Sequence, residues 1–210
     1  MSSRPATLLD LDGTLVDSVY HHVVAWQDAL REVGHEIPTV RIHAGIGMGG
    51  DRLLPWLLGG HGAEGMEQAA DGHRRRFLER ADDLTVTPGA RELLEDLRER
   101  DVPFVVATSA GEAEREVLLG VLGEPDLPLA GAGEHDSKPS PETLIAACGQ
   151  MGVTPEQAVL VGDSPWDAIA ARLAGVRSIG VRCGGFSDRA LREGGVARVV
   201  DHPRELIGQL

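Results

Sequence analysis

Lysine is almost absent from this chain of 210 residues. The 20 basic residues are 19 arginines and a single lysine, Lys138. A compact ammonium and a planar guanidinium are not interchangeable where geometry is demanding, so a lone lysine hints at a position with a chemical requirement. Chance also leaves a single lysine in some chains, and the hint depends on the motifs around it.

Positive charge and cysteine are scarce as well. The chain has 33 acidic residues and a formal net charge of −13. This balance argues against a nucleic-acid partner, which needs a basic surface, and against an anionic membrane partner. The two cysteines, Cys148 and Cys183, have no metal-ligand spacing. They fit a reducing cytosol better than a disulfide-built secreted protein.

Long apolar runs are also missing. No stretch reaches the roughly 18 consecutive apolar residues that indicate a transmembrane helix. The first residues contain no apolar signal core, and Asp10 and Asp12 come too early for one. We therefore expect a cytoplasmic protein, a monomer or small homo-oligomer, whose partner is a small molecule.

Strand-like and helix-like segments alternate over most of the chain. Short apolar runs predict strands at 6–10, 103–108, 127–130, 158–162, 176–181 and 196–200. Helices are predicted at 90–100, 112–122, 141–151, 168–174 and 203–210. This alternation is typical of βαβ units, and it predicts an α/β fold with a Rossmann-like, three-layer core around a parallel sheet.

The segment that follows the first strand has a different pattern. Apolar residues recur there at spacings of 4, 3, 4 and 3 between Val19 and Val33, which is one face of a helix over 17–33. Further helices are predicted at 51–58 and 63–81, and no strand is evident. We therefore expect an inserted all-helical cap domain, residues 15–84, and a catalytic core made of residues 1–14 and 85–210.

Polar residues follow several of the predicted strands. Asp10 and Asp12 come directly after the first strand, and two carboxylates two positions apart in extended chain point to the same side. One such carboxylate can attack while the other transfers protons. Thr108 and Ser109 end another strand. Lys138 lies in a loop before a helix, and Asp163 and Asp167 follow the 158–162 strand. Ligands of open α/β sheets bind beyond these strand ends.

This ordered set closely resembles the haloacid dehalogenase-like hydrolase superfamily. The resemblance rests on Asp10-Leu-Asp-Gly-Thr-Leu-Val-Asp-Ser18, Thr108, Lys138 with Pro139, and Gly162-Asp-Ser-Pro-Trp-Asp167. Four motifs in order, each after a strand or in a fitting loop, are far more specific than one. The chain is most similar to the helical-cap group that contains phosphoglycolate phosphatases and sugar-phosphate phosphatases.

The resemblance implies a Mg²⁺-dependent phosphatase acting on a small phosphorylated metabolite. Asp10 would attack phosphorus and form an aspartyl-phosphate, and Asp12 would protonate the leaving alkoxide and then activate water. Asp10, the backbone carbonyl of Asp12 and Asp163 would hold Mg²⁺, with Asp167 orienting the site from outside the direct ligands. This oxygen-only ligand set suits a hard cation.

The resemblance also implies how the phosphate is held. Thr108 and the backbone amide of Ser109 would bind its oxygens, and Lys138 would lie between the phosphate and Asp10. Two like charges 4 Å apart repel by about 4 kcal/mol at an effective dielectric of 20, so the carboxylates need both Mg²⁺ and the ammonium. A guanidinium needs more room, which explains the lone lysine.

Substrate contacts are expected from the cap. Relatives that act on sugar phosphates often carry a His and a Trp here, so His22 and Trp26, neighbours on one helix face, are candidates. Trp26 also lies on the apolar stripe, which favours a core role. Gly49 belongs to a glycine-rich loop, 45–50, that lacks the ending of a P-loop and is expected to be a cap hinge or to face the substrate. The arginines at 74–76 fit a solvated face, or one reaches a second anionic group.

Two other functions stay open. A β-phosphoglucomutase-like mutase would share Asp10 and Asp12 but return the phosphoryl group to a sugar. Its relatives tend to carry Glu-Asp where this chain has Gly162-Asp163, and an arginine where it reads Gly47-Met-Gly-Gly-Asp51. A non-catalytic binding module would be expected to have lost one of the motifs, and none is missing.

Overall fold

The computed structural model describes residues 5–130 and 137–210. Six parallel strands form the main sheet in the order β5-β4-β1-β6-β7-β8. Their bounds are β1 (Ala6–Leu9), β4 (Phe104–Ala107), β5 (Leu129–Ala130), β6 (Ala158–Gly162), β7 (Arg177–Val181) and β8 (Arg198–Val200). The expected parallel sheet and the Rossmann-like α/β core are confirmed.

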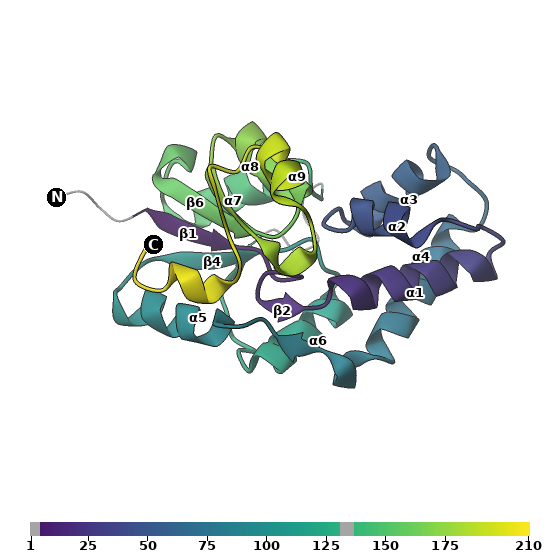
Figure 1. Cartoon of the computed structure of the whole chain (residues 1–210), viewed down its shortest axis with the longest axis horizontal. Helices are drawn as coiled ribbons and strands as arrows, with labels where there is room; N and C mark the ends of the chain where they lie inside the picture. The colour runs from purple at the N-terminus through teal and green to yellow at the C-terminus, as the bar shows by residue number, and fades with distance from the viewer. Residues whose placement is uncertain (1–4, 131–136) are drawn as a thin grey trace.

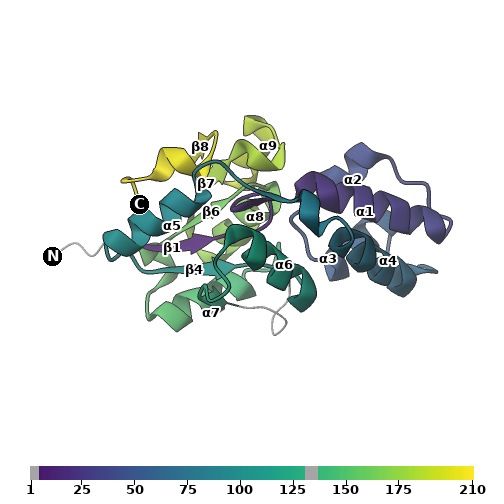
Figure 2. The ribbon, with the colours of Figure 1, turned by 90° about the horizontal axis from the view of Figure 1, so that it is seen from below.

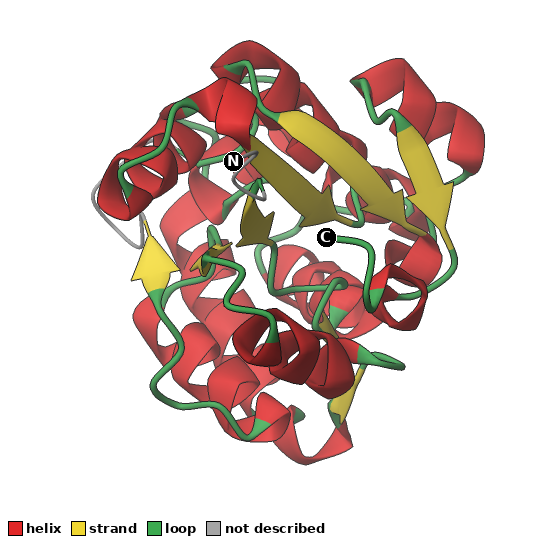
Figure 3. Ribbon diagram, turned by 90° about the vertical axis from the view of Figure 1, so that its left-hand side faces the viewer, coloured by secondary structure: helices red, strands yellow, loops and turns green. Residues whose placement is uncertain are grey.

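Helices cover both faces of this sheet (Figure 3). Leucines of α5 (Ala90–Glu99) and α6 (Glu112–Leu122) pack on one face, and α7 (Glu142–Met151) and α8 (Pro165–Ala174) pack on the other. Successive strand side chains point to opposite faces, so Leu9 joins the first cluster and Leu8 the second. Burial on both faces explains why these strands are nearly continuous apolar runs.

Four helices lie between β1 and β4 and take no part in the main sheet. They are α1 (Val19–Glu32), α2 (Thr39–Gly45), α3 (Gly50–Leu58) and α4 (Met66–Leu78). They pack around an apolar cluster of their own, and α1 runs along α4 beside the sheet body (Figures 1 and 2). The cap boundaries at residues 15 and 84 stay a prediction. Within the described ranges, no helix has the length and apolarity needed to span a membrane.

The expectation that residues 15–84 contain no strand is wrong at their first residues. Val16–Asp17 (β2) pairs antiparallel with Thr85–Val86 (β3). A strand of two residues is too short to show an alternating pattern, and its partner is remote in the sequence. This small ribbon lies where the chain leaves and re-enters the core.

Other differences are confined to short elements. The sequence patterns missed α2 and α9 (Asp188–Gly194), which has seven residues and packs on α8. The expected helix at 203–210 is instead a 3-10 turn, η4 (Pro203–Leu206). Elements of one or two turns bury too few residues to establish a helical period. Three further 3-10 turns are η1 (Ala81–Asp83), η2 (Pro155–Gln157) and η3 (Arg182–Gly184).

Candidate active site

Three neighbouring strands bring the predicted site residues to one edge of the sheet. Asp10 follows β1, Thr108 follows β4 and Asp163 follows β6, and β1 lies between the other two strands. The Asp10 amide still donates to the carbonyl of Val161, at 2.9 Å. This hydrogen bond continues the pairing of β1 with β6 as far as the backbone of Asp10. Ligands of open α/β sheets bind at this end of the strands.

Gly13 allows the turn that follows this strand. Its φ is +71°, and a Cβ there would lie 2.4 Å from Oδ2 of Asp163, so no larger residue fits. The next residue, Thr14, donates its hydroxyl to Oδ1 of Asp163 at 3.1 Å. Its carbonyl accepts from Thr87 Oγ1 at 2.6 Å. This turn therefore positions Asp163 and links it to the chain segment that follows β3.

Three buried carboxylates converge at the strand ends. Asp10, Asp163 and Asp167 each offer one oxygen, and these oxygens all lie within 4.8 Å of one another. The Lys138 ammonium forms ion pairs with Asp10 and, at 2.7 Å, with Asp167. One ammonium leaves two of the three negative charges uncompensated. A cluster of hard oxygen donors with excess negative charge fits a divalent cation such as Mg²⁺.

The pKa values of the clustered carboxyls and of Lys138 reflect the excess of negative charge in this cluster. Burial, followed by the charges of Asp167 and Asp10, raises the pKa of Asp163 well above its usual value. Burial also raises the pKa of Asp10 to about 7, although Lys138 opposes this. Burial alone would lower the pKa of Lys138, but Asp10 and Asp167 outweigh it and raise that pKa. A bound divalent cation would favour the ionised form of both raised carboxyls.

Asp167 has a second structural task at the start of α8. Its Oδ2 accepts from the amide of Ser164 at 3.1 Å and from the Ser164 hydroxyl at 2.6 Å, which caps the helix. Its Oδ1 faces Lys138. The cap therefore fixes the carboxylate that orients the ammonium. The expected role of Asp167 outside the direct metal ligands stays a prediction.

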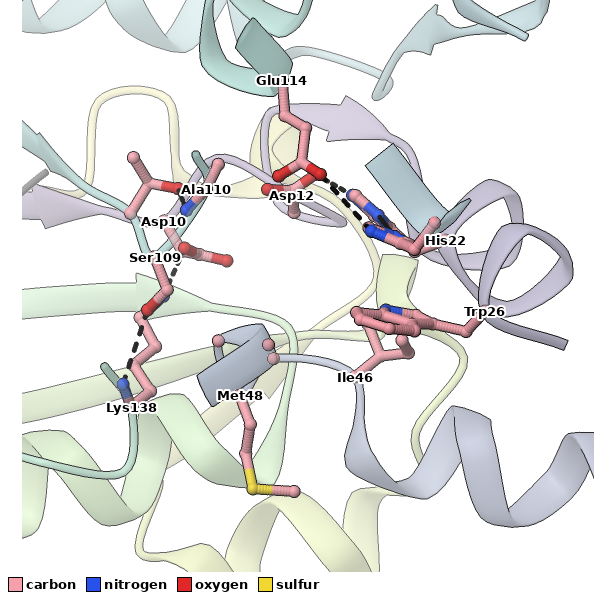
Figure 4. A pocket seen from close by; sticks show the side chains of 15 residues that line it. Asp10, Asp12, His22, Trp26, Ile46, Met48, Ser109, Ala110, Glu114 and Lys138 are labelled. Atoms are coloured by element: carbon pink, nitrogen blue, oxygen red, sulfur yellow. Dashed lines mark hydrogen bonds and ion pairs between the residues drawn. The ribbon is translucent and has the colours of Figure 1, made fainter. Parts of the chain in front are cut away.

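The side chain of Asp12 faces away from this cluster and toward the cap. Its Oδ1 accepts from the Ser18 hydroxyl at 2.6 Å and contacts Nε2 of His22 at 2.9 Å. Nδ1 of His22 lies 2.9 Å from Nε2 of His73, whose Nδ1 lies 3.4 Å from Oε1 of Glu114. The chain of contacts runs from the core through α1 and α4 and back to α6. Its members Asp12, His22 and Glu114 are labelled in Figure 4.

One proton arrangement satisfies every contact in this chain. Burial lowers the pKa of His22, but the Asp12 carboxylate outweighs it and raises that pKa. Burial and the neighbouring His22 lower the pKa of His73 well below its usual value. A charged His22 then donates to both Asp12 and His73, and a neutral His73 directs its Nδ1–H toward Glu114. His22 and Ser18 lower the pKa of Asp12, overcoming the opposite effect of burial.

The candidate residues of the core and the cap meet across a cavity of about 70 Å³. Asp10, Ser109 and Lys138 lie on one side, and His22 and Trp26 lie on the other (Figure 4). The lining also includes Asp12, Gly49 and Thr108. Asp163 and Asp167 do not line this cavity. They lie behind it, where Asp163 is clustered with Asp10 and Asp167 contacts Lys138. The structure thus brings together residues far apart in the sequence.

Hydrogen bonds from backbone amides hold the two residues after β4 that are predicted to bind phosphate. Thr108 is buried and its Oγ1 accepts from the amide of Ala110 at 3.0 Å. The Ser109 hydroxyl accepts from the amide of Lys138 at 3.4 Å. These contacts hold the loop after β4 beside the lysine. That both residues bind phosphate stays a prediction.

Two residues of this site were missed at the level of sequence. His73 and Glu114 lie 51 and 92 residues from His22 along the chain, and no motif or helical period connects them. Trp26 packs in the cap cluster and also lines the cavity, and that it contacts the substrate stays a prediction. Of the arginines at 74–76, Arg75 and Arg76 pair with Glu32.

Comparison with known proteins identifies relatives over nearly the whole chain. Residues 5–175 match the pattern of the haloacid dehalogenase-like hydrolases. The chain is 32% identical to a phosphoglycolate phosphatase of Pseudomonas savastanoi, over 95% of this chain and 77% of the relative. It is also 32% identical to an N-acetylmuramic acid 6-phosphate phosphatase of Pseudomonas putida, over 96% and 93%. A crystal structure of a hydrolase from Pseudomonas syringae superposes with a TM-score of 0.93 at 30% identity, covering 98% and 97%.

The acidic cluster predicts that Mg²⁺ stabilises the fold. Millimolar Mg²⁺ should raise the unfolding temperature, because bound cation relieves the repulsion among Asp10, Asp163 and Asp167. Binding at 100 times the dissociation constant adds about 2.7 kcal/mol to the free energy of unfolding. Differential scanning fluorimetry with MgCl₂, against NaCl of equal ionic strength, measures this shift.

Asp163→Asn should lose most of the Mg²⁺-dependent shift, and Asp126→Asn, at an exposed aspartate, should keep it. An equal shift in the two variants would place the metal elsewhere.

Proposed function

The chain belongs to the haloacid dehalogenase-like hydrolases, and from this membership we propose that it is a Mg²⁺-dependent phosphatase that cleaves a small phosphate monoester through an aspartyl-phosphate. Phosphoric monoester hydrolysis is the activity for which its relatives are named. One observation carries the proposal. The Asp10–Lys138 pair and the Asp12–His22 pair line the same cavity.

Asp10 is the nucleophile of the proposed reaction. Lys138 holds Oδ1 of Asp10, so the carboxylate is fixed and its other oxygen is available for attack. The new bond joins that oxygen to phosphorus while the bond from phosphorus to the ester oxygen breaks. Bound Mg²⁺, held by Asp10, Asp163 and the backbone carbonyl of Asp12, would neutralise charge on the transferring group.

Asp12 is the proton-transfer group. It passes the proton of the charged His22 imidazole, which donates to its Oδ1, on to the leaving ester oxygen, which departs as an alcohol and leaves His22 neutral. It then takes a proton from a water whose oxygen attacks phosphorus and releases Asp10 and inorganic phosphate. Ser18 and His22 hold its Oδ1, so the carboxylate is oriented before substrate binds. The charged imidazole of His22 also keeps positive charge next to Asp12.

The remaining core residues bind the phosphoryl oxygens. Thr108, Ser109 and Lys138 all line the cavity that Asp10 lines. The donors would be the Thr108 hydroxyl, the Ser109 amide and the Lys138 ammonium. Donors fixed before the reaction stabilise charge that develops in the transition state, because they need no reorganisation.

A phosphatase is favoured over the mutase alternative. A mutase must hold a bisphosphate and therefore needs a second cationic site near the first. The described residues that line the inner cavity include no arginine. Their cations are Lys138, which is committed to Asp10 and Asp167, and His22, which is committed to Asp12. The outer wall carries Arg74, which pairs with Asp71 at 3.4 Å.

Phosphate release from a metabolite panel tests the proposal directly. The panel holds phosphoglycolate, hexose phosphates, glycerol phosphates and nucleotides, each with Mg²⁺ and with a chelator. Metal-dependent release supports the phosphatase. Conversion of β-glucose 1-phosphate in the presence of a bisphosphate primer, without net phosphate release, would support the mutase instead.

Asp10→Asn should lower kcat by about 10⁴-fold or more, because the amide cannot form the covalent intermediate. Steady-state phosphate release on the best substrate of the panel measures this loss. Asp126→Asn serves as the matched exposed control. A variant that retained near-normal turnover would rule out the covalent route.

Lys138→Arg should lower kcat by about 10²- to 10³-fold, the range seen when one fixed charge-stabilising donor is lost. The side chain is 2% exposed and in contact with two carboxylates, so a larger guanidinium cannot take its place without displacing them. The opposite exchange, Arg189→Lys, is at a side chain 86% exposed and should change nothing. Equal activity of the two variants would contradict the assigned role.

His73→Asn should lower kcat by about tenfold or more with a smaller change in KM, since His73 orients His22 and through it Asp12. Hydrogen bonds to charged groups contribute roughly 1.5–3 kcal/mol, which sets this scale. His61→Asn, at an exposed histidine, is the control. Unfolding temperatures of both variants separate lost positioning from lost stability, and an unchanged kcat in a folded His73→Asn protein would contradict the role.

A further inference from the structure

We propose that the substrate is the phosphate ester of a neutral, ring-sized polyhydroxylated group, namely a sugar phosphate, and not a short ester that carries a carboxylate. This inference rests on the proposed phosphatase function and narrows its substrate. It follows from the space and the charges that lie beside the phosphate site.

A second cavity adjoins the first. It has a volume of about 420 Å³, within the roughly 300–1,000 Å³ typical of small-molecule sites. The two cavities share lining residues, which are Trp26, Gly50, His73, Ser109 and Glu114. The space nearest to the ester group of a phosphate bound beside Asp10 is therefore large enough for a ring.

Two of the shared lining residues form an aromatic stack. Trp26 stacks on His73 with ring centroids 3.9 Å apart and an angle of 10° between the planes. His73 also contacts His22 and Glu114. Trp26 is 4% exposed and one face of its ring is covered, so this stack bounds the space available to the ester group and offers it no open stacking face.

The outer cavity carries an excess of negative charge, which disfavours a second anion there. Glu114 lines both cavities, and Asp51 and Glu67 line the outer one. Carboxylates accept hydrogen bonds from hydroxyl groups, which favours a polyol. A substrate carboxylate close to these side chains would instead be repelled. Among the described lining residues the only arginine or lysine of the outer cavity is Arg74, which is paired with Asp71.

Relative turnover of an acyl phosphate and two kinds of phosphate ester tests this inference. Acetyl phosphate reports the phosphoryl transfer without a ring, phosphoglycolate carries the short carboxylate, and a set of hexose and N-acetylhexosamine 6-phosphates carries the ring. We expect kcat/KM for the best ring substrate to exceed that for phosphoglycolate by about tenfold or more.

The outcomes separate the two proposals. Cleavage of acetyl phosphate together with a phosphoglycolate kcat/KM equal to or above that of every sugar phosphate would overturn this inference and leave the phosphatase standing. Mg²⁺-dependent cleavage of none of them, acetyl phosphate included, would overturn the proposed function and this inference with it.

A variant that fills the outer cavity adds a second test. Ala70 lies on α4 and lines the outer cavity but not the inner one. Ala70→Phe should lower the ratio of kcat/KM for the sugar phosphate to that for acetyl phosphate by about tenfold. Gln68→Phe, at an exposed position of the same helix, should leave the ratio unchanged. If Ala70→Phe unfolds, Ala70→Leu replaces it, and an unchanged ratio in a folded variant would contradict the assignment of this cavity to the sugar.

Discussion

The contact of the Lys138 ammonium with Asp10 and Asp167 is the interaction on which the rest of this site depends. It joins three parts of the core: the end of β1, the loop before α7 and the start of α8. All three side chains are buried, and a buried charge that loses its partner is strongly destabilising, so none of them can change alone. The same contact fixes one oxygen of Asp10 and leaves the carboxylate cluster short of positive charge. Cation binding and nucleophile orientation therefore have one common cause.

The cap is tied to this chemistry by a second buried network. Asp12 and Glu114 belong to the core, whereas His22 and His73 belong to α1 and α4, so the network is complete only when the cap lies against the core as it does here. Orientation of the proposed proton-transfer group is therefore coupled to the position of the cap. The β2–β3 ribbon, where the chain enters and leaves the four helices, lies at the place at which such a movement would be centred.

Chemistry and selectivity come from different parts of the molecule. The groups assigned to phosphoryl transfer lie at the ends of β1, β4 and β6 and in the adjoining loops, whereas much of the wall of the outer cavity comes from α1, α3 and α4. A core of this kind serves many substrates, because function is decided by the site built on the fold. Here His73 and Glu114 line both cavities, so two members of the network that holds Asp12 also border the outer cavity.

The sequence by itself determined the parallel core, the insertion after the first strand and the candidate residues Asp10, Asp12, Thr108, Lys138 and Asp163. Each of these follows from a local pattern: an apolar run fully buried in a strand, a helical period, or a polar motif next to either. Tertiary structure alone decided that Asp12 turns toward the cap, that Lys138 bridges Asp10 and Asp167, and that His73 and Glu114 complete the network. These contacts join residues on separate elements, and a hydrogen bond between remote side chains depends on packing and leaves no period or spacing in the chain.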